Sequence, residues 1–256
     1  MLIDSHAHLA LFDKAERGQI VENAMQAGVS KILTIGTNLA DSRESCEIAG
    51  SFSQVSAAVG VHPHDVEDTS AKDFLDELRM MADQETVVAI GEIGLDFYRM
   101  ISPPDLQKDF FRRQLELAQE LHLPVIIHDR AADQECLEIL RDFDFSETGG
   151  IFHCFSGDLA MAEDVWKMGF LVSIAGPVTF KKPGFLPDVA KGLPLEALLV
   201  ESDCPYLAPV PFRGKRNEPA YVKYTAEKVA ELRGISVEEL AGQTSRNFAA
   251  LFKRMG

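Results

Sequence analysis

Histidine and acidic side chains stand at the ends of several short apolar runs in this sequence. The first run begins at Leu2 and ends in two histidines, His6 and His8. Residues two apart on a β-strand point to the same face, so both imidazoles can bind one cation. Four later runs also end in a histidine or a carboxylate that we take as a metal ligand. Together the five runs offer six possible metal ligands, which are His6, His8, Glu92, His128, His153 and Asp203.

The number of these ligands indicates two metal ions rather than one. A single catalytic zinc usually takes three protein ligands, whereas six ligands suit two divalent ions about 3.5–4 Å apart. A carboxylate is the natural bridge between two cations. We assign that role to Glu92, because it comes from the middle of the series of runs and no lysine ends a run. Asp203 is then expected to bind one ion and to act as the general base toward a water whose acidity the cations raise.

Two further carboxylates are expected behind these ligands. Glu201 lies two residues before Asp203 and therefore on the same face of its strand. It either orients a ligand or is a core carboxylate paired with a cation, and the sequence favours neither reading. Asp96 ends the same run that contains Glu92, and we place it among the orienting groups as well.

Substrate contacts are expected from residues beside the metal ligands. His62 ends the third run in the sequence Gly-Val-His-Pro, where it could bind a metal ion, contact a phosphate or cap the strand. His64 is assigned to a loop. Arg130, two residues after His128, and Arg213, in a basic loop near the end of the chain, could hold a phosphate group. For the basic loop, simple exposure to solvent is the alternative. An aromatic at Tyr98 could stack on a terminal base.

The elements that would position these residues alternate between two sequence patterns. Short apolar runs rich in β-branched residues are separated by stretches with helical periodicity. The expected strands begin near Leu2, Ile32, Val55, Val87, Pro124, Gly150, Phe170 and Ala197. The expected helices include Lys14–Gln26, Ala71–Asp83, Asp105–Leu121, Ala131–Arg141 and Leu159–Met168. Eight such alternations in 256 residues predict an α/β protein with a (β/α)8 TIM barrel, whose strands all end at one rim.

The last part of the chain departs from this alternation. A loop rich in proline and basic residues, 205–219, precedes two C-terminal helices. Ser236 and Glu239 form a capping-box sequence at the start of the second helix. The sequence has no repeat, linker or low-complexity segment, so we expect residues 1–256 to form a single metal-dependent hydrolase domain with extra C-terminal helices. It also lacks a GxGxxG or Walker A motif, which argues against common nucleotide-binding folds.

Charge and composition narrow the class of protein. With 40 acidic and 25 basic residues, the net charge of −15 argues against a basic surface that coats nucleic acid or anionic membrane. It does not exclude an enzyme that grips a single phosphate. The sequence shows neither a signal peptide nor an apolar run of about 18 residues, so a cytoplasmic protein without membrane contact is expected. The four scattered cysteines are expected to be buried free thiols. No obligate protein partner is evident.

Seven motifs then occur in order along most of the chain. They are DSHAHL (4–9), GVHP (60–63), GEIGLDFY (91–98), PVIIH (124–128), HCFSG (153–157), ESDCPYL (201–207) and NEP (217–219). This set resembles the TatD family of metal-dependent deoxyribonucleases within the amidohydrolase superfamily. The sequence departs from the family pattern at Asp129, because the family commonly has a small residue between His128 and Arg130.

The resemblance implies a TIM barrel with two divalent ions that hydrolyses DNA phosphodiester bonds, often as a 3′–5′ exonuclease. The expected substrates are DNA ends or short single-stranded DNA. Carried over by motif, one ion would be held by His6, His8, Glu92 and Asp203, and the other by Glu92, His128 and His153. Asn217 matches the last motif and is expected to orient its loop or to contact the substrate.

The sequence leaves the metal and the substrate class open. Four imidazoles favour Zn²⁺ or Mn²⁺ as softer cations, whereas the family resemblance implies Mg²⁺. The same rim could polarise a carbonyl group, so the alternative function is hydrolysis of lactones, cyclic amides or small phosphoesters. A metal-binding protein without catalytic activity is the remaining alternative.

Overall fold

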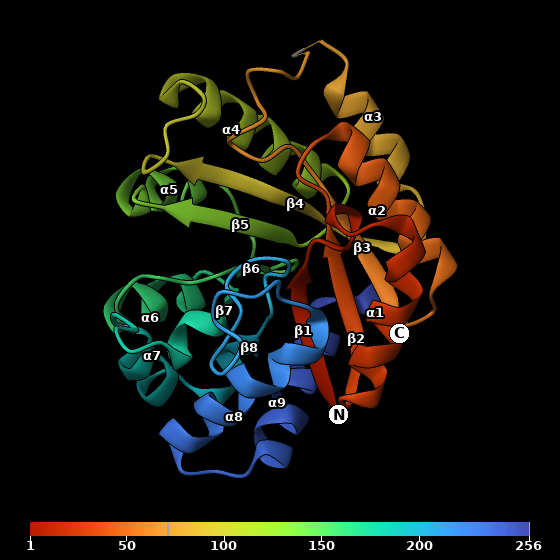
Figure 1. Ribbon diagram of the computed structural model, residues 1–256. Helices are drawn as coiled ribbons and strands as arrows, with labels where there is room; N and C mark the ends of the chain where they lie inside the picture. Colours follow the sequence, from red (N-terminus) through yellow and green to blue (C-terminus); the bar gives the residue numbers. More distant parts are fainter. Residues whose placement is uncertain (71, 256) are drawn as a thin grey trace.

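Eight parallel strands form a nearly closed barrel, and helices lie around its outside (Figure 1). The computed structural model describes residues 1–70 and 72–255. Neighbouring strands pair in the order of the sequence, which confirms the predicted TIM barrel. The strands are β1 (Leu2–Ala7), β2 (Val29–Ile35), β3 (Val55–Val59), β4 (Val87–Asp96), β5 (Val125–Arg130), β6 (Gly150–Phe152), β7 (Phe170–Ile174) and β8 (Leu198–Val200).

Helices connect the strands and extend the chain beyond the barrel. They are α1 (Lys14–Gln26), α2 (Leu39–Ser51), α3 (Phe74–Ala82), α4 (Pro104–Glu120), α5 (Asp133–Leu140), α6 (Leu159–Lys167), α7 (Leu186–Gly192), α8 (Val222–Arg233) and α9 (Val237–Leu251). The five helices named from the sequence are present with small changes at their ends, and residue 71 of the expected 71–83 helix lies outside the described residues. Ser236 caps α9 by accepting a hydrogen bond from the backbone N–H of Glu239 at 3.0 Å. No described helix is long and apolar enough to cross a membrane.

The barrel closes between its first and last strands through the chain that follows β8. Strand β8 ends at Val200, but the backbone continues beside β1 and forms a parallel bridge between Cys204 and Ala7. The N–H of Asp203 donates to the carbonyl oxygen of His6 at 3.0 Å, and the N–H of His8 donates to that of Cys204 at 2.9 Å. This closure fixes Asp203 beside the two histidines of β1.

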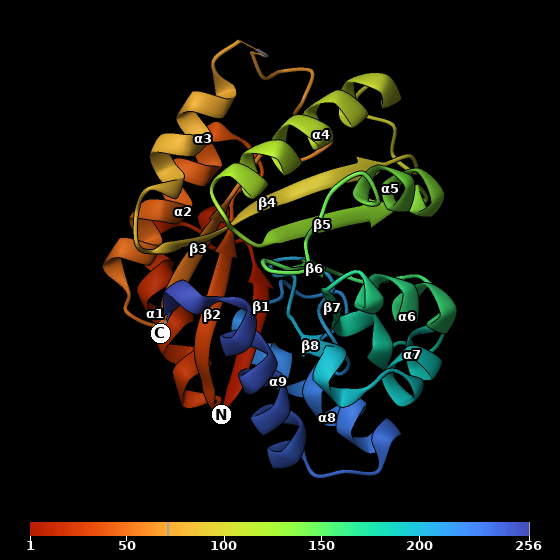
Figure 2. The same cartoon turned by 180° about the vertical axis from the view of Figure 1, so that it is seen from behind.

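The end of the barrel opposite the strand carboxyl termini is closed by apolar packing. Helix α9 lies against β1 and β8 (Figure 2). Its Phe248, together with Phe252 just after it, packs into a cluster of buried strand residues, which includes Ile3, Leu33, Ile35, Ala58, Val88, Ala89, Ile126, Ile151 and Leu199. A larger apolar cluster lies between the strands and the surrounding helices. The titratable side chains are therefore gathered at the other end of the barrel.

Candidate metal centre

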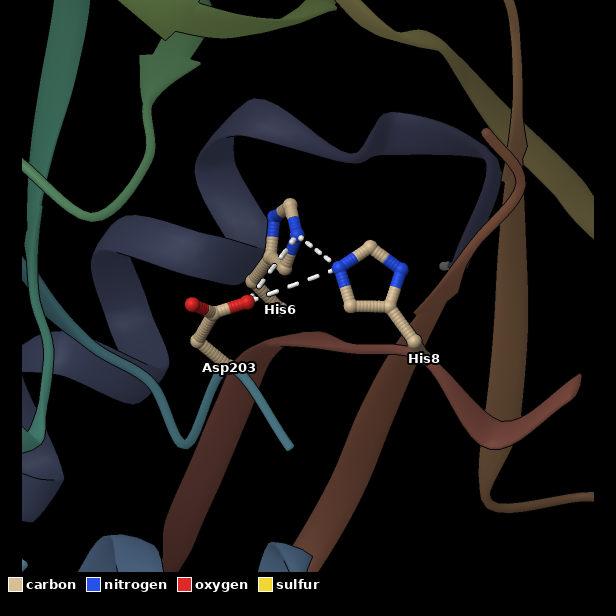
Figure 3. Close-up of side chains that lie close together, drawn as sticks. All are labelled: His6, His8 and Asp203. Carbon is tan, nitrogen blue, oxygen red and sulfur yellow. Dashed lines mark hydrogen bonds and ion pairs between the residues drawn. The ribbon is translucent and has the colours of Figure 1, made fainter. Parts of the chain in front are cut away.

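The side chains of His6 and His8 come together at the end of β1, although only His6 lies in the strand. The strand ends at Ala7, so His8 follows it in the next turn. The two Nε2 atoms are 3.2 Å apart, and Oδ1 of Asp203 lies 3.4 Å from His8 Nε2 and 3.9 Å from His6 Nε2 (Figure 3). Nδ1 of His8 faces the carbonyl oxygen of Ile35 at 3.3 Å. Because a carbonyl only accepts, Nδ1 carries the hydrogen in the neutral ring and Nε2 offers its lone pair.

The carboxylate of Glu92 lies between two pairs of histidines. Its Oε2 is 3.3 Å from His6 Nε2 and 3.7 Å from His8 Nε2, while its Oε1 is 2.6 Å from His128 Nδ1 and 2.8 Å from His153 Nε2. Burial of Glu92 favours the neutral acid, but the facing imidazoles outweigh it and hold the pKa well below its usual value. One oxygen toward each pair is the arrangement expected of a carboxylate that bridges two cations.

Two carboxylates lie behind the histidines on the far side from Glu92. Oε1 of Glu201 is 3.4 Å from Nδ1 of His153, and Oδ2 of Asp96 is 3.6 Å from Nε2 of His128. Glu201 is fully buried and also accepts a hydrogen bond from the backbone N–H of Cys154 at 2.7 Å. Metal-binding histidines commonly donate their second nitrogen to a carboxylate, which fixes the ring. The contacts of Glu201 thus favour the orienting role over a core ion pair.

The donor set fits divalent cations. His6 and His8 bring two ring nitrogens to 3.2 Å, and so do His128 and His153. Ligands about 2.0–2.1 Å from a tetrahedral zinc stand roughly 3.3–3.4 Å from each other, close to this spacing. Three groups of ligand atoms lie within 4.8 Å of one another: His6, His8 and Asp203; His6, His153 and Glu201; and His62, Glu92 and His128.

His62 joins this cluster with its other nitrogen already occupied. Its Nε2 lies 3.4 Å from Oε1 of Glu92, and its Nδ1 accepts a hydrogen bond from the backbone N–H of His64 at 3.1 Å. In a neutral imidazole the second nitrogen then carries the hydrogen. Burial and the nearby charge of His128 lower the pKa of His62 to about 3, which keeps the ring neutral. In this tautomer Nε2 donates a hydrogen bond, which is compatible with contact to a phosphate, and the role of His62 in substrate binding stays a prediction.

His64 lies in a loop, as expected from the sequence, and its side chain also lines the cavity. Its Nε2 lies 2.7 Å from Oδ2 of Asp96, the same oxygen that faces His128. His62 and His64 repeat the spacing of His6 and His8, and that repetition was the available signal. The position of its side chain in the cavity was not predicted, because His64 lies in a turn beyond β3, where strand alternation does not give the direction of a side chain.

The cluster forms the floor of a cavity of about 560 Å³. Among the lining residues, Arg99 was not predicted, whereas Arg130 was. The guanidinium of Arg130 lies 4.3 Å from the centre of the Tyr98 ring, and Tyr98 is 69% exposed. The half-buried Cys154 also lines the cavity, which corrects the expectation that all four thiols are buried. The other three cysteines are buried and free as expected.

Two predicted substrate contacts lie elsewhere. Asn217 is fully buried, and its amide donates to the carbonyl oxygens of Ser202 at 2.6 Å and Tyr206 at 2.7 Å. It therefore orients the loop after β8 and has no surface to offer a substrate. Arg213 does not line the cavity; its guanidinium lies 4.4 Å from the centre of the Phe180 ring. Of the two roles expected of Asn217, orientation of its loop is the one that these contacts support. The expected contact of Arg213 with a phosphate in the cavity is not supported by its position against Phe180.

Asp129, which departs from the family pattern, lines the same cavity. Both of its carboxylate oxygens are buried, and within the described residues no side chain donates a hydrogen bond to them. Burial, strengthened by the charge of Asp133, raises the pKa of Asp129 to about 7. The extra carboxyl is thus present beside His128 in an environment that disfavours its charge.

A model of the TatD related DNase family matches residues 3–253. The chain belongs to this family. It is 42% identical over 254 residues to the metal-dependent hydrolase YabD of Bacillus subtilis, with 99% of each chain covered. It is 37% identical over 243 residues to the 3′–5′ ssDNA/RNA exonuclease TatD of Erwinia amylovora, with 93% of each covered. The crystal structure of the TatD homologue YjjV from Escherichia coli superposes with a TM-score of 0.92 at 31% identity, over 98% of each chain.

Membership of the TatD family confirms the resemblance and the prediction of a metal-dependent hydrolase. The organophosphorus hydrolase of Deinococcus radiodurans is a more distant neighbour, with a TM-score of 0.60 at 18% identity over 98% of this chain and 92% of that one. At that identity the likeness extends to the barrel fold alone, and the substrate has to be argued from the site.

Proposed function

We propose that this TatD-family chain hydrolyses phosphodiester bonds in single-stranded DNA, and that it removes nucleotides from the 3′ end. The observation that carries the proposal is the position of Glu92, whose two oxygens each face a separate pair of histidines. A carboxylate so placed can bridge two cations, and paired cations clamp the attacking and leaving oxygens of an in-line displacement at phosphorus. The Erwinia relative, a 3′–5′ ssDNA/RNA exonuclease, supports the same substrate class and polarity.

Two sets of side chains would hold the cations. One set is His6, His8, Glu92 and Asp203, and the other is Glu92, His128 and His153. Bound divalent ions would supply a Lewis acid that lowers the pKa of water and offsets charge on the phosphate. The nitrogen-rich donor set favours Mn²⁺ or Zn²⁺ over Mg²⁺. Glu201 and Asp96 would hold the rings of His153 and His128 in place.

Asp203 is the group best placed to take a proton from an attacking water. It lines the cavity, and its Oδ1 is already turned toward His8. Burial raises the pKa of Asp203, but the hydrogen bond to His8 and the neighbouring imidazoles outweigh burial and lower it overall. The carboxylate therefore stays ionised near neutral pH and is available as a general base.

The phosphate would be held by hydrogen-bond donors and cations that line the same cavity as Asp203. His62 can donate through Nε2 as a neutral ring, and Arg99 and Arg130 add positive charge at the wall. A phosphodiester carries one negative charge, and these groups compensate it where an otherwise acidic protein would repel it. A lactone or amide needs no such charge, so the two arginines favour phosphodiesters over the alternative substrates.

The proposal is tested with 3′- and 5′-labelled single-stranded DNA, single-stranded RNA, duplex DNA, lactones and small phosphoesters, each with added Mn²⁺. We expect stepwise release of mononucleotides from the 3′ end. Asp203→Asn should reduce hydrolysis by about 10²–10⁴-fold, which is the usual contribution of a general base. Asp83→Asn, which changes an exposed carboxylate at the end of α3, is the matched control and should leave the rate unchanged. Activity confined to lactones, or full activity in Asp203→Asn, would overturn the proposal.

A further inference from the structure

Two loops at the rim differ in charge from the rest of this acidic chain. Segments 175–185 and 204–217 contain none of the 40 acidic residues but five of the 25 basic ones. These five are Lys181, Lys182, Arg213, Lys215 and Arg216, and all five are exposed. One of them, Arg216, is paired with Glu16 at 2.9 Å. The other four form a local positive surface that the net charge of −15 conceals.

The two loops pack together and form one continuous surface. The backbone N–H of Val210 donates to Oγ1 of Thr179 at 2.9 Å, which joins the loop after β8 to the loop after β7. The guanidinium of Arg213 covers the ring of Phe180 at 4.4 Å from its centre. Since Phe180 directly precedes Lys181, this contact brings the cations of the two loops next to one another. We call residues 175–185 and 204–217 the basic double loop.

The basic double loop begins at the cavity and also presents aromatic rings. Tyr206 and Leu207 of its second segment line the cavity, and Tyr206 is 54% exposed. In the first segment Phe185 is 58% exposed and lies three residues after Lys182. Exposed cations beside exposed aromatic faces are the two elements of surfaces that bind single-stranded nucleic acid, because phosphates meet the charges and bases stack on the rings.

We infer that the basic double loop binds the single strand beyond the cavity, several nucleotides from the bond that is cut. This inference rests on the proposed nuclease function and adds to it a preference for long single strands over the shortest oligonucleotides. A duplex would keep its bases stacked inside the helix, away from Phe185 and Tyr206. An acidic protein as the binding partner would offer negative charge but no bases to stack on these two rings. The chemistry of the surface therefore favours an unpaired polynucleotide.

The test compares binding of a trinucleotide with binding of an oligothymidylate of about 15 nucleotides, a length within the usual range of single-strand sites. Both carry a fluorophore and a phosphorothioate backbone that resists cleavage, and the Mn²⁺-loaded protein is titrated by anisotropy. We expect the longer strand to bind at least about tenfold more tightly. The triple variant Lys181→Gln/Lys182→Gln/Lys215→Gln should remove most of that difference and leave binding of the trinucleotide unaffected. For the long strand, the slope of log K against log salt concentration should fall in magnitude by about 2, since each phosphate contact to a single strand contributes about 0.7.

A matched triple variant controls for the change in net charge. Lys31, Lys167 and Lys253 lie near the start of β2, at the end of α6 and after α9, away from the rim. Lys31→Gln/Lys167→Gln/Lys253→Gln should bind both strands like the unmodified protein. Equal affinity for the two lengths, an equal loss in both triple variants, or competition by polyglutamate as strong as by the strand would overturn the inference.

A separate variant tests the aromatic part of the surface. Phe185→Ala should weaken binding of the long strand by about fivefold or more, the loss expected for one stacked base, and should not affect an abasic strand of the same length. An equal loss on both strands would contradict base stacking. Failure of the nuclease proposal is recognised by a separate measurement, the hydrolysis of a trinucleotide with an ordinary phosphodiester backbone. That reaction depends on the cavity and not on the basic double loop.

Discussion

At the scale of single residues, the pairs His6/His8 and His62/His64 have the same spacing in the sequence but contain rings with different chemistry. In the neutral ring of His8, Nδ1 carries the hydrogen and faces the carbonyl oxygen of Ile35, so Nε2 has a free lone pair. The ring of His62 receives the backbone N–H of His64 at Nδ1 and is left with a hydrogen on Nε2. One ring can therefore bind a cation and the other can donate to an anion. The difference depends on which backbone group each ring meets, and the spacing of the residues does not encode it.

His62→Ala separates these two roles. If His62 donates to a phosphate, its loss removes a hydrogen bond to a charged group, worth about 1.5–3 kcal/mol, and kcat/KM should fall by about 10- to 150-fold. The bound metal, measured by mass spectrometry of the purified protein, should not change. His8→Ala should lose metal, and His122→Asn, at a histidine with positive φ far from the rim, should change neither quantity. A loss of metal in His62→Ala would identify it as a ligand instead.

At the scale of elements, the short strand β8 is held at both ends by buried asparagines. Asn247 of α9 donates to the carbonyl oxygens of Leu195 and Leu198, both at 2.8 Å, where the strand begins. Beyond the end of the strand, Asn217 donates to Ser202 and Tyr206. Three residues of strand provide few ladder hydrogen bonds, so these amides stabilise the segment that carries the proposed base.

The two asparagines predict a difference between stability and activity. Replacing either by alanine leaves two carbonyls without their donors and should lower the free energy of unfolding by about 1–3 kcal/mol or more, measured in urea. Asn217→Ala should also lower kcat by roughly tenfold, because Asp203 directly follows Ser202 and small displacements of a reacting group are costly. Asn247→Ala should keep kcat at conditions where it is folded. Equal kcat values in the two variants would show that Asn217 has only a structural role.

The elements differ in how well the sequence predicts them. Strand starts were predictable, since buried parallel strands read as short apolar runs, and α1 was predicted to the residue. Helix α2 was not named because it buries Ser42 and Ser45 where apolar residues would make a periodic pattern. The convergence of the proposed ligands at the strand ends followed from the barrel fold, whereas the positions of loop residues did not. Arg99 lines the cavity, and Arg213 and Asn217 do not. A loop is positioned by its tertiary contacts, which single-sequence periodicity does not report.

At the scale of the whole molecule, the two ends of the barrel have different roles: one contains apolar packing that stabilises the fold, and the other contains the side chains of the proposed reaction. Apolar side chains, completed by Phe248 and Phe252, fill one end, and the buried imidazoles and carboxylates occupy the other. The proposed ligand atoms come from β1 and the turn after it, from β4 and β5, and from the turns after β6 and β8, so a cation bound there would join segments from the whole length of the chain. Binding at such a site favours only the folded state, since the unfolded chain separates the ligands.

Removal of metal should therefore lower the thermal stability of the entire barrel. At a free metal concentration about 100 times the Kd, binding contributes about 2.7 kcal/mol, and a chelator should lower Tm by roughly 5–10 °C. Phe252→Ala should lower Tm with and without metal, because a buried Phe→Ala substitution costs about 3–5 kcal/mol. Phe252 and the histidines lie at opposite ends of the barrel and do not contact each other, so the stabilisation by metal should be nearly the same in the variant. Calorimetry gives the Tm of the unmodified protein and of Phe252→Ala, each with and without chelator. A Tm that does not change when the chelator is added would contradict the proposed metal centre.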